Sequence, residues 1–96
     1  MILSPQAEAE LEEILAYFEK QNAGSNRYAV YLLDKIKKTS IHYIQNPELG
    51  QKIGDDGDRF FRCDHLMFVY SNVENGIEIS TVWDGRRDPK TLKLSR

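Results

Sequence analysis

Several side chains in the last third of this chain could together cleave RNA. General acid–base cleavage needs a proton acceptor, a proton donor and a cation for the negative charge that develops on the phosphate. His65 and Tyr70 could transfer protons, and the positive charge could come from Arg62, Arg86 or Arg87. These residue types therefore make an RNA-cleaving enzyme one hypothesis for the chain.

The same residues also have structural interpretations. Tyr70 lies in an apolar run, where an aromatic side chain can simply pack against helices. Arg62 and Arg87 each lie close in sequence to a carboxylate, Asp64 or Asp88, and could form structural ion pairs. Residue types like these occur in most domains of this size, so chemistry alone does not establish a nuclease.

Thiol catalysis and metal binding have less support. Neighbours along a strand point to opposite faces, so Cys63 and His65 can share a side while Asp64 cannot join them. We therefore expect a half-buried cysteine and a histidine at the edge. No pair formed from these residues and His42 has the spacing of metal ligands, and the acidic stretch 55–58 lacks the remaining ligands of a calcium loop. We expect no metal and no other cofactor.

The candidate residues lie on a predicted three-stranded meander. Its apolar runs are 59–63, 66–72 and 77–82, and the last joint contains Asn-Gly, the strongest short hairpin signal. A parallel return would need a crossover of about a dozen residues, so the three strands must be antiparallel. The meander leads into a charged turn at 83–89, which carries two adjacent arginines and is the surface of greatest interest.

Two amphipathic helices precede the meander. The first is predicted from Ser4, an N-cap followed by proline, to about Lys20. The second, which Ser25 or Asn26 can cap, is predicted to end before Asn46-Pro47, because proline disfavours helical geometry in the residue ahead of it. The positions expected to face the core are Ala7, Leu11, Ile14, Leu15 and Phe18, then Ala29, Leu32, Leu33, Ile36 and Tyr43 or Ile44. The lysines expected to point outward are Lys35, Lys37 and Lys38.

These elements predict an α+β fold. A short strand at 1–3 joins the sheet edge, and the two helices form an antiparallel hairpin packed on one face of the three-stranded meander. Residues 47–57 are expected to form a loop. The whole chain, 1–96, is expected to be a single domain.

Composition indicates a globular domain without a membrane span. Of the 96 residues, 41% are hydrophobic and 29% charged, and the formal net charge is −2. This balance weighs against direct nucleic-acid binding, which usually needs a basic domain. No apolar run approaches the ~18 residues of a membrane helix, the start does not resemble a signal peptide, and the lone cysteine cannot form an internal disulfide. We expect a cytoplasmic protein.

Charge is distributed unevenly along the chain. Residues 1–24 contain five Glu and one Lys, whereas 86–96 contain five cations and only Asp88 as an acid. This asymmetry predicts a cationic patch that could receive an acidic partner or a phosphate backbone. The alternative is a solvated tail with no partner.

The chain resembles the ParE/RelE superfamily of toxins from bacterial type II toxin–antitoxin modules. The resemblance covers nearly the whole chain in the order strand, helix, helix and three-strand meander. It is carried by Ser4-Pro5-x-Ala7-x-x-x-Leu11-x-x-Ile14-x-x-Tyr17, Asn46-Pro47-x-x-Gly50 and Val82-Trp83-Asp84-Gly85-Arg86-Arg87-Asp88-Pro89.

The superfamily contains two activities, and the resemblance favours one of them. RelE-like members cleave mRNA on the ribosome, whereas ParE-like members are associated with DNA gyrase. The cleaving members commonly have an arginine where this chain has Met67, and they tend to be strongly basic. Arg62-Cys63-Asp64-His65 and the aromatic strand after it resemble the ParE branch. This implies a toxin that binds gyrase and is not an enzyme, with an mRNA endoribonuclease and a non-toxic protein-binding module as alternatives.

The resemblance also implies a partner and a set of site residues. The partner is a cognate antitoxin, encoded nearby, whose flexible acidic and apolar segment wraps the toxin in a hetero-oligomer. Residues expected to contact the target or the antitoxin are Arg62, His65, Trp83, Arg86, Arg87, Asp88 and Lys90. No catalytic residue is expected; if the chain is a ribonuclease, the catalytic residues would be Arg62, Tyr70 and Arg87.

Overall fold

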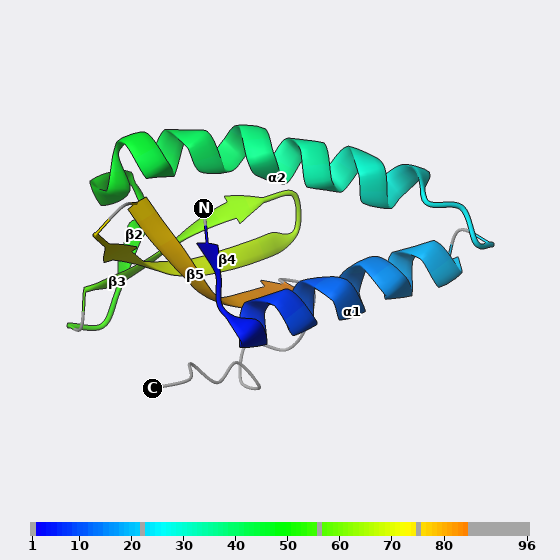
Figure 1. Ribbon diagram of the computed structural model, residues 1–96, viewed down its shortest axis with the longest axis horizontal. Helices are drawn as coiled ribbons and strands as arrows, with labels where there is room; N and C mark the ends of the chain where they lie inside the picture. Colours follow the sequence, from blue (N-terminus) through cyan, green and yellow to red (C-terminus); the bar gives the residue numbers. More distant parts are fainter. Residues whose placement is uncertain (1, 22, 56, 75, 85–96) are drawn as a thin grey trace.

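The computed structural model describes residues 2–21, 23–55, 57–74 and 76–84. Within these ranges the chain forms an α+β fold, with two helices beside a single sheet (Figure 1). The elements in chain order are β1 (Ile2–Leu3), α1 (Pro5–Gln21), α2 (Arg27–Gln45), a 3-10 helix η1 (Pro47–Leu49), β2 (Gln51–Ile53), β3 (Asp58–Cys63), β4 (Leu66–Val73) and β5 (Gly76–Asp84).

The five strands form one sheet in the order β1-β5-β4-β3-β2. The meander of β3, β4 and β5 is antiparallel, as predicted, and β1 is added parallel to β5 at the edge. Strand β2, which pairs antiparallel with β3, lies in the segment predicted to be a loop. It has only three residues between two glycines, too few for an alternating pattern to show in the sequence.

The end of the meander also differs from the prediction. Trp83 and Asp84 were expected to begin the charged turn, but they are the last residues of β5. They stay in the sheet because β4 is long enough to pair with them: Met67 faces Trp83, and Leu66 faces Asp84. Trp83 is therefore held at a defined position on the sheet.

Helix α1 begins where the sequence predicts, and Ser4 explains why. The Oγ of Ser4 accepts a hydrogen bond from the amide of Ala7 (3.1 Å), which is the capping bond expected at a helix N-terminus. The same hydroxyl donates to the carbonyl of Ser80 (3.0 Å), and the Ser4 amide donates to the carbonyl of Ile79 (2.9 Å). Ser4 thus starts the helix and ties it to β5.

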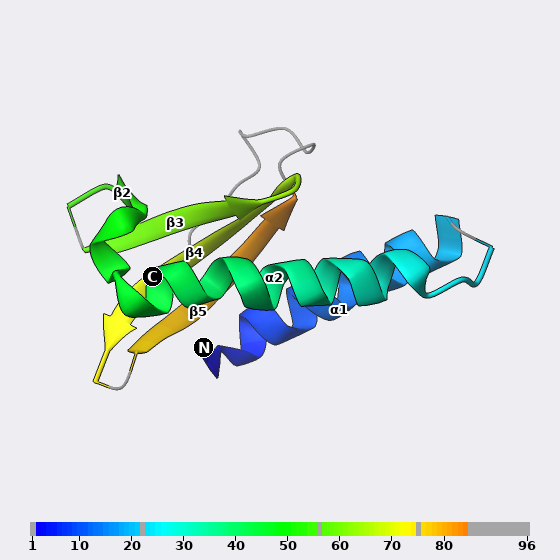
Figure 2. The ribbon, with the colours of Figure 1, turned by 90° about the horizontal axis from the view of Figure 1, so that it is seen from above.

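The two helices and the sheet share one hydrophobic core, as predicted. The buried members are Ala7, Leu11 and Ile14 from α1, Leu32 and Ile36 from α2, and Phe61, Cys63, Leu66, Phe68, Tyr70, Ile77, Ile79 and Val82 from the sheet. The end of the hairpin where α1 leads into α2 extends past the sheet in both views (Figures 1 and 2). No helix in the described ranges is long and apolar enough to cross a membrane.

One predicted core position on α2 is wrong. Leu33 is 39% exposed, because it lies one residue beyond Leu32 and is therefore rotated about 100° away from the buried stripe. Ser40 takes a buried place instead, four residues after Ile36. Its hydroxyl donates to the carbonyl of Lys37 (2.9 Å), so a polar side chain is tolerated there.

Candidate functional site

Arg62, Met67 and Trp83 form a row across three strands on the face of the sheet that points away from the core. Met67 on β4 is the register partner of both Arg62 on β3 and Trp83 on β5. Their sequence neighbours point into the core, and side chains alternate along a strand, so these three side chains share the opposite face. Arg62 is exposed, whereas Met67 and Trp83 are partly buried.

A second row on the same face lies directly beside the first. Phe60, Val69 and Thr81 are register partners on the same three strands. The guanidinium carbon of Arg62 lies 5.8 Å from the centre of the Phe60 ring, within the range of a cation–π contact. We call the two rows together the outer face. Its members range from the exposed Arg62, through the partly buried Phe60, Met67 and Trp83, to the buried Val69 and Thr81.

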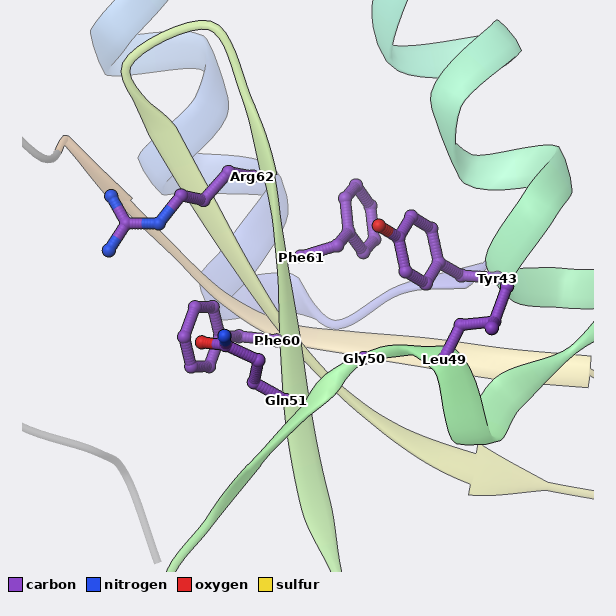
Figure 3. Close-up of a pocket in the computed structure, with 7 residues that line it drawn as sticks. All are labelled: Tyr43, Leu49, Gly50, Gln51, Phe60, Phe61 and Arg62. Atoms are coloured by element: carbon purple, nitrogen blue, oxygen red, sulfur yellow. The ribbon is translucent and has the colours of Figure 1, made fainter.

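A pocket of about 330 Å³ adjoins the outer face at the β2–β3 edge. Figure 3 shows Phe60, Gln51 and Arg62 on one side of β3, with Phe61 and Tyr43 on the other. Leu49, at the end of η1, is 62% exposed at this pocket. The β2–β3 edge thus offers a hollow of mixed polar and apolar lining, to which Arg62 contributes.

Tyr70 lies on the opposite face from Arg62, inside the core. Its side chain is 1% exposed, and its hydroxyl donates to the carbonyl of Pro47 (2.6 Å) and accepts from the amide of Gly50 (3.0 Å). Burial raises the pKa of Tyr70, so the hydroxyl is a poorer acid here than in water. The strand-aromatic interpretation of Tyr70 therefore fits the structure.

The loop at 47–50 is held by a second residue, whose role the sequence did not indicate. Arg59, the register partner of Tyr70, donates one guanidinium nitrogen to the carbonyls of Glu48 (3.0 Å) and Gly50 (2.8 Å). Only the folded chain brings Arg59 to these carbonyls, because they are about ten residues away in sequence.

The turn between β3 and β4 is joined to α2 by Asp64. Its carboxylate forms an ion pair with Lys35 and accepts a hydrogen bond from the Tyr28 hydroxyl (3.3 Å). The hydrogen bond from Lys35 lowers the pKa of Asp64 and raises the pKa of Lys35. The suggested pair of Asp64 with Arg62 is therefore wrong, and Lys35 does not simply point outward. Alternation ends at Cys63, because Asp64 (φ 55°) already belongs to the turn.

His65 lies between the two helices and not on the outer face. Its ring is 5.1 Å from that of Phe18 in an edge contact and 6.5 Å from that of Tyr28 in a stacked arrangement. The Nε2 atom of His65 is buried and makes no hydrogen bond to any described residue. His65 and Arg62, both predicted site residues, are thus held on different sides of the sheet.

Cys63 is more deeply buried than predicted. It is 3% exposed and contacts the hydroxyl of Thr39, whose Oγ1 lies 3.8 Å from the sulfur. Burial raises the pKa of the thiol, which keeps it protonated and unreactive near neutral pH. Thiol catalysis therefore gains no support from this geometry.

A family model for the ParE toxin of type II toxin–antitoxin systems, parDE, matches residues 1–89 of this chain. The chain belongs to the ParE toxin family. A search of curated proteins found no match. Membership of the ParE family makes the chain a toxin of the type II toxin–antitoxin class and implies an antitoxin partner.

The remaining predicted site residues of this ParE-family chain, Arg86, Arg87, Asp88 and Lys90, lie outside the described residues. Their roles stay predictions, as does an ion pair of Arg87 with Asp88.

Among the residues that are described, no group of three His, Cys, Asp or Glu side chains could hold a metal ion. Phe60 was not among the predicted site residues. Its position two residues before Arg62 on a strand would have placed it on the same face of the sheet.

Proposed function

We propose that this ParE-family toxin inhibits growth by binding DNA gyrase, without cutting RNA. The observation that carries the proposal is the separation of the candidate catalytic groups. Arg62 lies on the outer face, whereas the Tyr70 hydroxyl is in the core, occupied by Pro47 and Gly50. General acid–base catalysis needs its groups within hydrogen-bond reach of one substrate, and these two cannot reach the same one.

The outer face has the composition of a protein-binding surface. Trp and Arg are the residues most enriched among those that dominate binding energy, and aromatic side chains are common at interface centres. Arg62, Trp83 and Phe60 occupy two neighbouring rows of the sheet. We propose that Arg62 and Trp83 contact the target, together with Arg86, Arg87 and Asp88, while His65 supports the fold between the helices.

Purified gyrase provides the direct test. We expect the chain to abolish supercoiling or trap DNA breaks, and to leave mRNA intact in a translation-dependent cleavage assay. Arg62→Ala should weaken the effect on gyrase about tenfold or more, as expected for the loss of a central arginine. Lys20→Ala, which removes an exposed cation at the far end of α1, is the matched control and should act like the wild type.

The opposite pattern would overturn the proposal. Cuts at defined codon positions with gyrase unaffected would establish RNA cleavage and return attention to Arg62, Tyr70 and Arg87. Expression that leaves growth unchanged, with neither assay responding, would instead indicate a non-toxic binding module. A thermal melt of each variant separates lost contact from lost folding.

We also propose that a flexible acidic segment of the cognate antitoxin neutralises the toxin. Its apolar side chains would cover exposed hydrophobic positions such as Tyr17 on the hairpin and Leu49 beside the pocket. Its carboxylates would meet Arg86, Arg87 and Lys90, since opposite charges steer and align such partners. Binding should therefore weaken as salt rises, and coexpression should restore growth.

A further inference from the structure

The outward side of α2 carries two exposed aliphatic side chains. Val30 is 59% exposed and Ile41 is 49% exposed, and the exposed residues Asp34 and Lys37 lie between them. The spacing of four, three and four residues places all four on one side of the helix, which we call the α2 stripe. The outward side of a surface helix is normally polar, and Val30 and Ile41 interrupt that polar side at two places.

The α2 stripe is left open by the rest of the fold. The buried residues Leu32 and Ile36 attach the other side of α2 to the core. Figures 1 and 2 show α2 as the outer layer over the sheet, and no other described element covers its outward side. A partner could therefore reach the stripe without any rearrangement of the described fold.

The α2 stripe is symmetric about its own midpoint. Val30 and Ile41 are equally far from the point between residues 35 and 36, and so are Asp34 and Lys37. An antiparallel copy of the same helix would place each Val30 opposite an Ile41, and each Asp34 opposite a Lys37. A two-fold interface requires this kind of self-complementarity, in which the same patch serves on both copies.

We propose that two copies of this chain associate through an antiparallel pairing of their α2 helices. The occupant of the stripe is thus a second copy, with Val30 and Ile41 forming two apolar contacts and Asp34 and Lys37 forming two ion pairs. A parallel pairing would instead place like charges opposite each other at both polar positions. The polar pair therefore sets both orientation and register, as polar residues do in coiled coils.

Asp34 already forms an ion pair within α2, and this pair does not prevent Asp34 from pairing with Lys37 of a second copy. Lys38 lies 2.9 Å from the Asp34 carboxylate, one turn along the helix, and both side chains are largely exposed. Exposed pairs of this kind contribute little, so turning the Asp34 carboxylate toward a second copy sacrifices little stability. In the dimer the flanking aliphatic contacts would partly exclude water from the new pairs and strengthen them.

The α2 pairing leaves the proposed target surface accessible. The stripe lies on α2, whereas Arg62 and Trp83 lie on the sheet face that points away from the core. The stripe spans about 16 Å of helix, from about 1.5 Å per residue, so the interface is small. Interfaces of this size are generally weak, and we expect a reversible monomer–dimer equilibrium.

Sedimentation velocity on the purified chain, over a concentration series, tests the proposal. We expect the sedimentation coefficient to rise from that of a monomer toward that of a dimer. Asp34→Lys or Lys37→Glu alone should weaken association roughly tenfold or more, because each creates two like-charge contacts. An equimolar mixture of the two variants should dimerise again, because the mixed dimer regains both ion pairs. The two substituted positions form one pair with reversed polarity, and the unchanged Lys37 and Asp34 form the other with its original polarity. Glu12→Lys, an exposed charge reversal on α1, is the matched control.

Each result bears on the proposal directly. A monomer at every concentration would overturn it and leave the stripe to a different protein. A dimer that withstands both charge reversals, or variants that fail to re-associate when mixed, would overturn the α2 pairing. Circular dichroism of each variant checks folding, and Val30→Ser provides a second, uncharged disruption at a site where the exposed side chain supports no core contact.

Discussion

Glu10 on α1 and Thr81 on β5 are joined by a hydrogen bond of 2.7 Å from the threonine hydroxyl to the carboxylate. The same oxygen of Glu10 accepts the amide of Val82 at 2.9 Å. Among the described residues, strand β1 pairs with β5 at Glu78 and Ile79. Beyond Ile79, the edge amide of Val82 donates to the Glu10 side chain and not to the backbone of a neighbouring strand. Glu10 therefore covers this part of the sheet edge and fixes α1 against it.

Replacing Glu10 should therefore destabilise the fold. Glu10→Ala leaves the Thr81 hydroxyl and the Val82 amide without their acceptor, which we expect to lower the free energy of unfolding by about 1–3 kcal/mol. Glu10→Gln keeps one acceptor oxygen and should lose less. Urea denaturation measures both. Glu13→Ala, an exposed change on the same helix, should stay within about 0.5 kcal/mol of the wild type.

Tyr70→Phe should reduce stability and leave the action on gyrase intact. The change removes the hydroxyl that pairs with Pro47 and Gly50, and leaves a buried amide unsatisfied, for an expected loss of about 1–3 kcal/mol. Gyrase inhibition per folded molecule should equal that of the wild type. A variant that stays folded but loses an RNA-cleaving activity would show that Tyr70 is a catalytic acid or base.

Glycine should be required at position 50 because the Tyr70 hydroxyl lies too close for a side chain, and not because of the backbone conformation. Its φ of −67° suits any residue, but a Cβ there would lie 2.2 Å from the Tyr70 hydroxyl oxygen. Gly50→Ala and Gly50→Asn should each destabilise the fold by about 1–3 kcal/mol through overpacking.

Gly54 is a control site, where the backbone conformation and not close packing favours glycine. Its φ is +62°, and a Cβ at this position would meet nothing within 4 Å beyond its neighbours in the chain. Gly54→Asn should therefore be tolerated better than Gly54→Ala, because asparagine adopts the left-handed conformation more readily. Thermal melts of the four variants compare the two sites. Equal tolerance of alanine and asparagine at Gly54 would contradict the conformational explanation.

Asp64 should make stability depend on pH in the acidic range. Because Lys35 lowers its pKa in the folded state, its contribution is present above the unfolded pKa of about 3.9. That contribution is lost as the pH falls through the lower, folded pKa. Asp64→Asn keeps the left-handed turn but removes the charge.

The comparison of wild type with Asp64→Asn should thus change with pH and salt. We expect a small advantage of the wild type in melting temperature at neutral pH, which shrinks below about pH 4. It should also shrink in high salt, because the Lys35 pair is solvent-exposed. A difference that stays constant across the acidic range would show that the charge of Asp64 does not stabilise the fold.

His65→Phe should fold at least as well as the wild type. The new ring can keep the contacts with Phe18 and Tyr28, and it removes the buried Nε2 atom that has no partner among the described residues. Differential scanning calorimetry should give an unchanged or higher melting temperature. A melting temperature lower by several degrees would show that the imidazole nitrogen makes a stabilising hydrogen bond. Lost toxicity in a stable variant would place His65 in the target contact.

The sequence by itself determined the elements that depend on local signals. The Ser4-Pro5 start, the 3.6-residue stripe of Ala7, Leu11 and Ile14, and the Asn-Gly joint each act within a few residues. The start of the first helix, its buried side and the meander were predictable for this reason.

Only the tertiary structure decided how distant side chains meet. The row of Arg62, Met67 and Trp83 depends on strand register, and a strand as short as β2 has no pattern of its own. The pairing of Lys35 with Asp64, and of Glu10 with Thr81, joins a helix to a distant part of the sheet. Periodicity indicates which side of an element is buried, but not which residue on another element it meets, because that depends on how the whole chain packs.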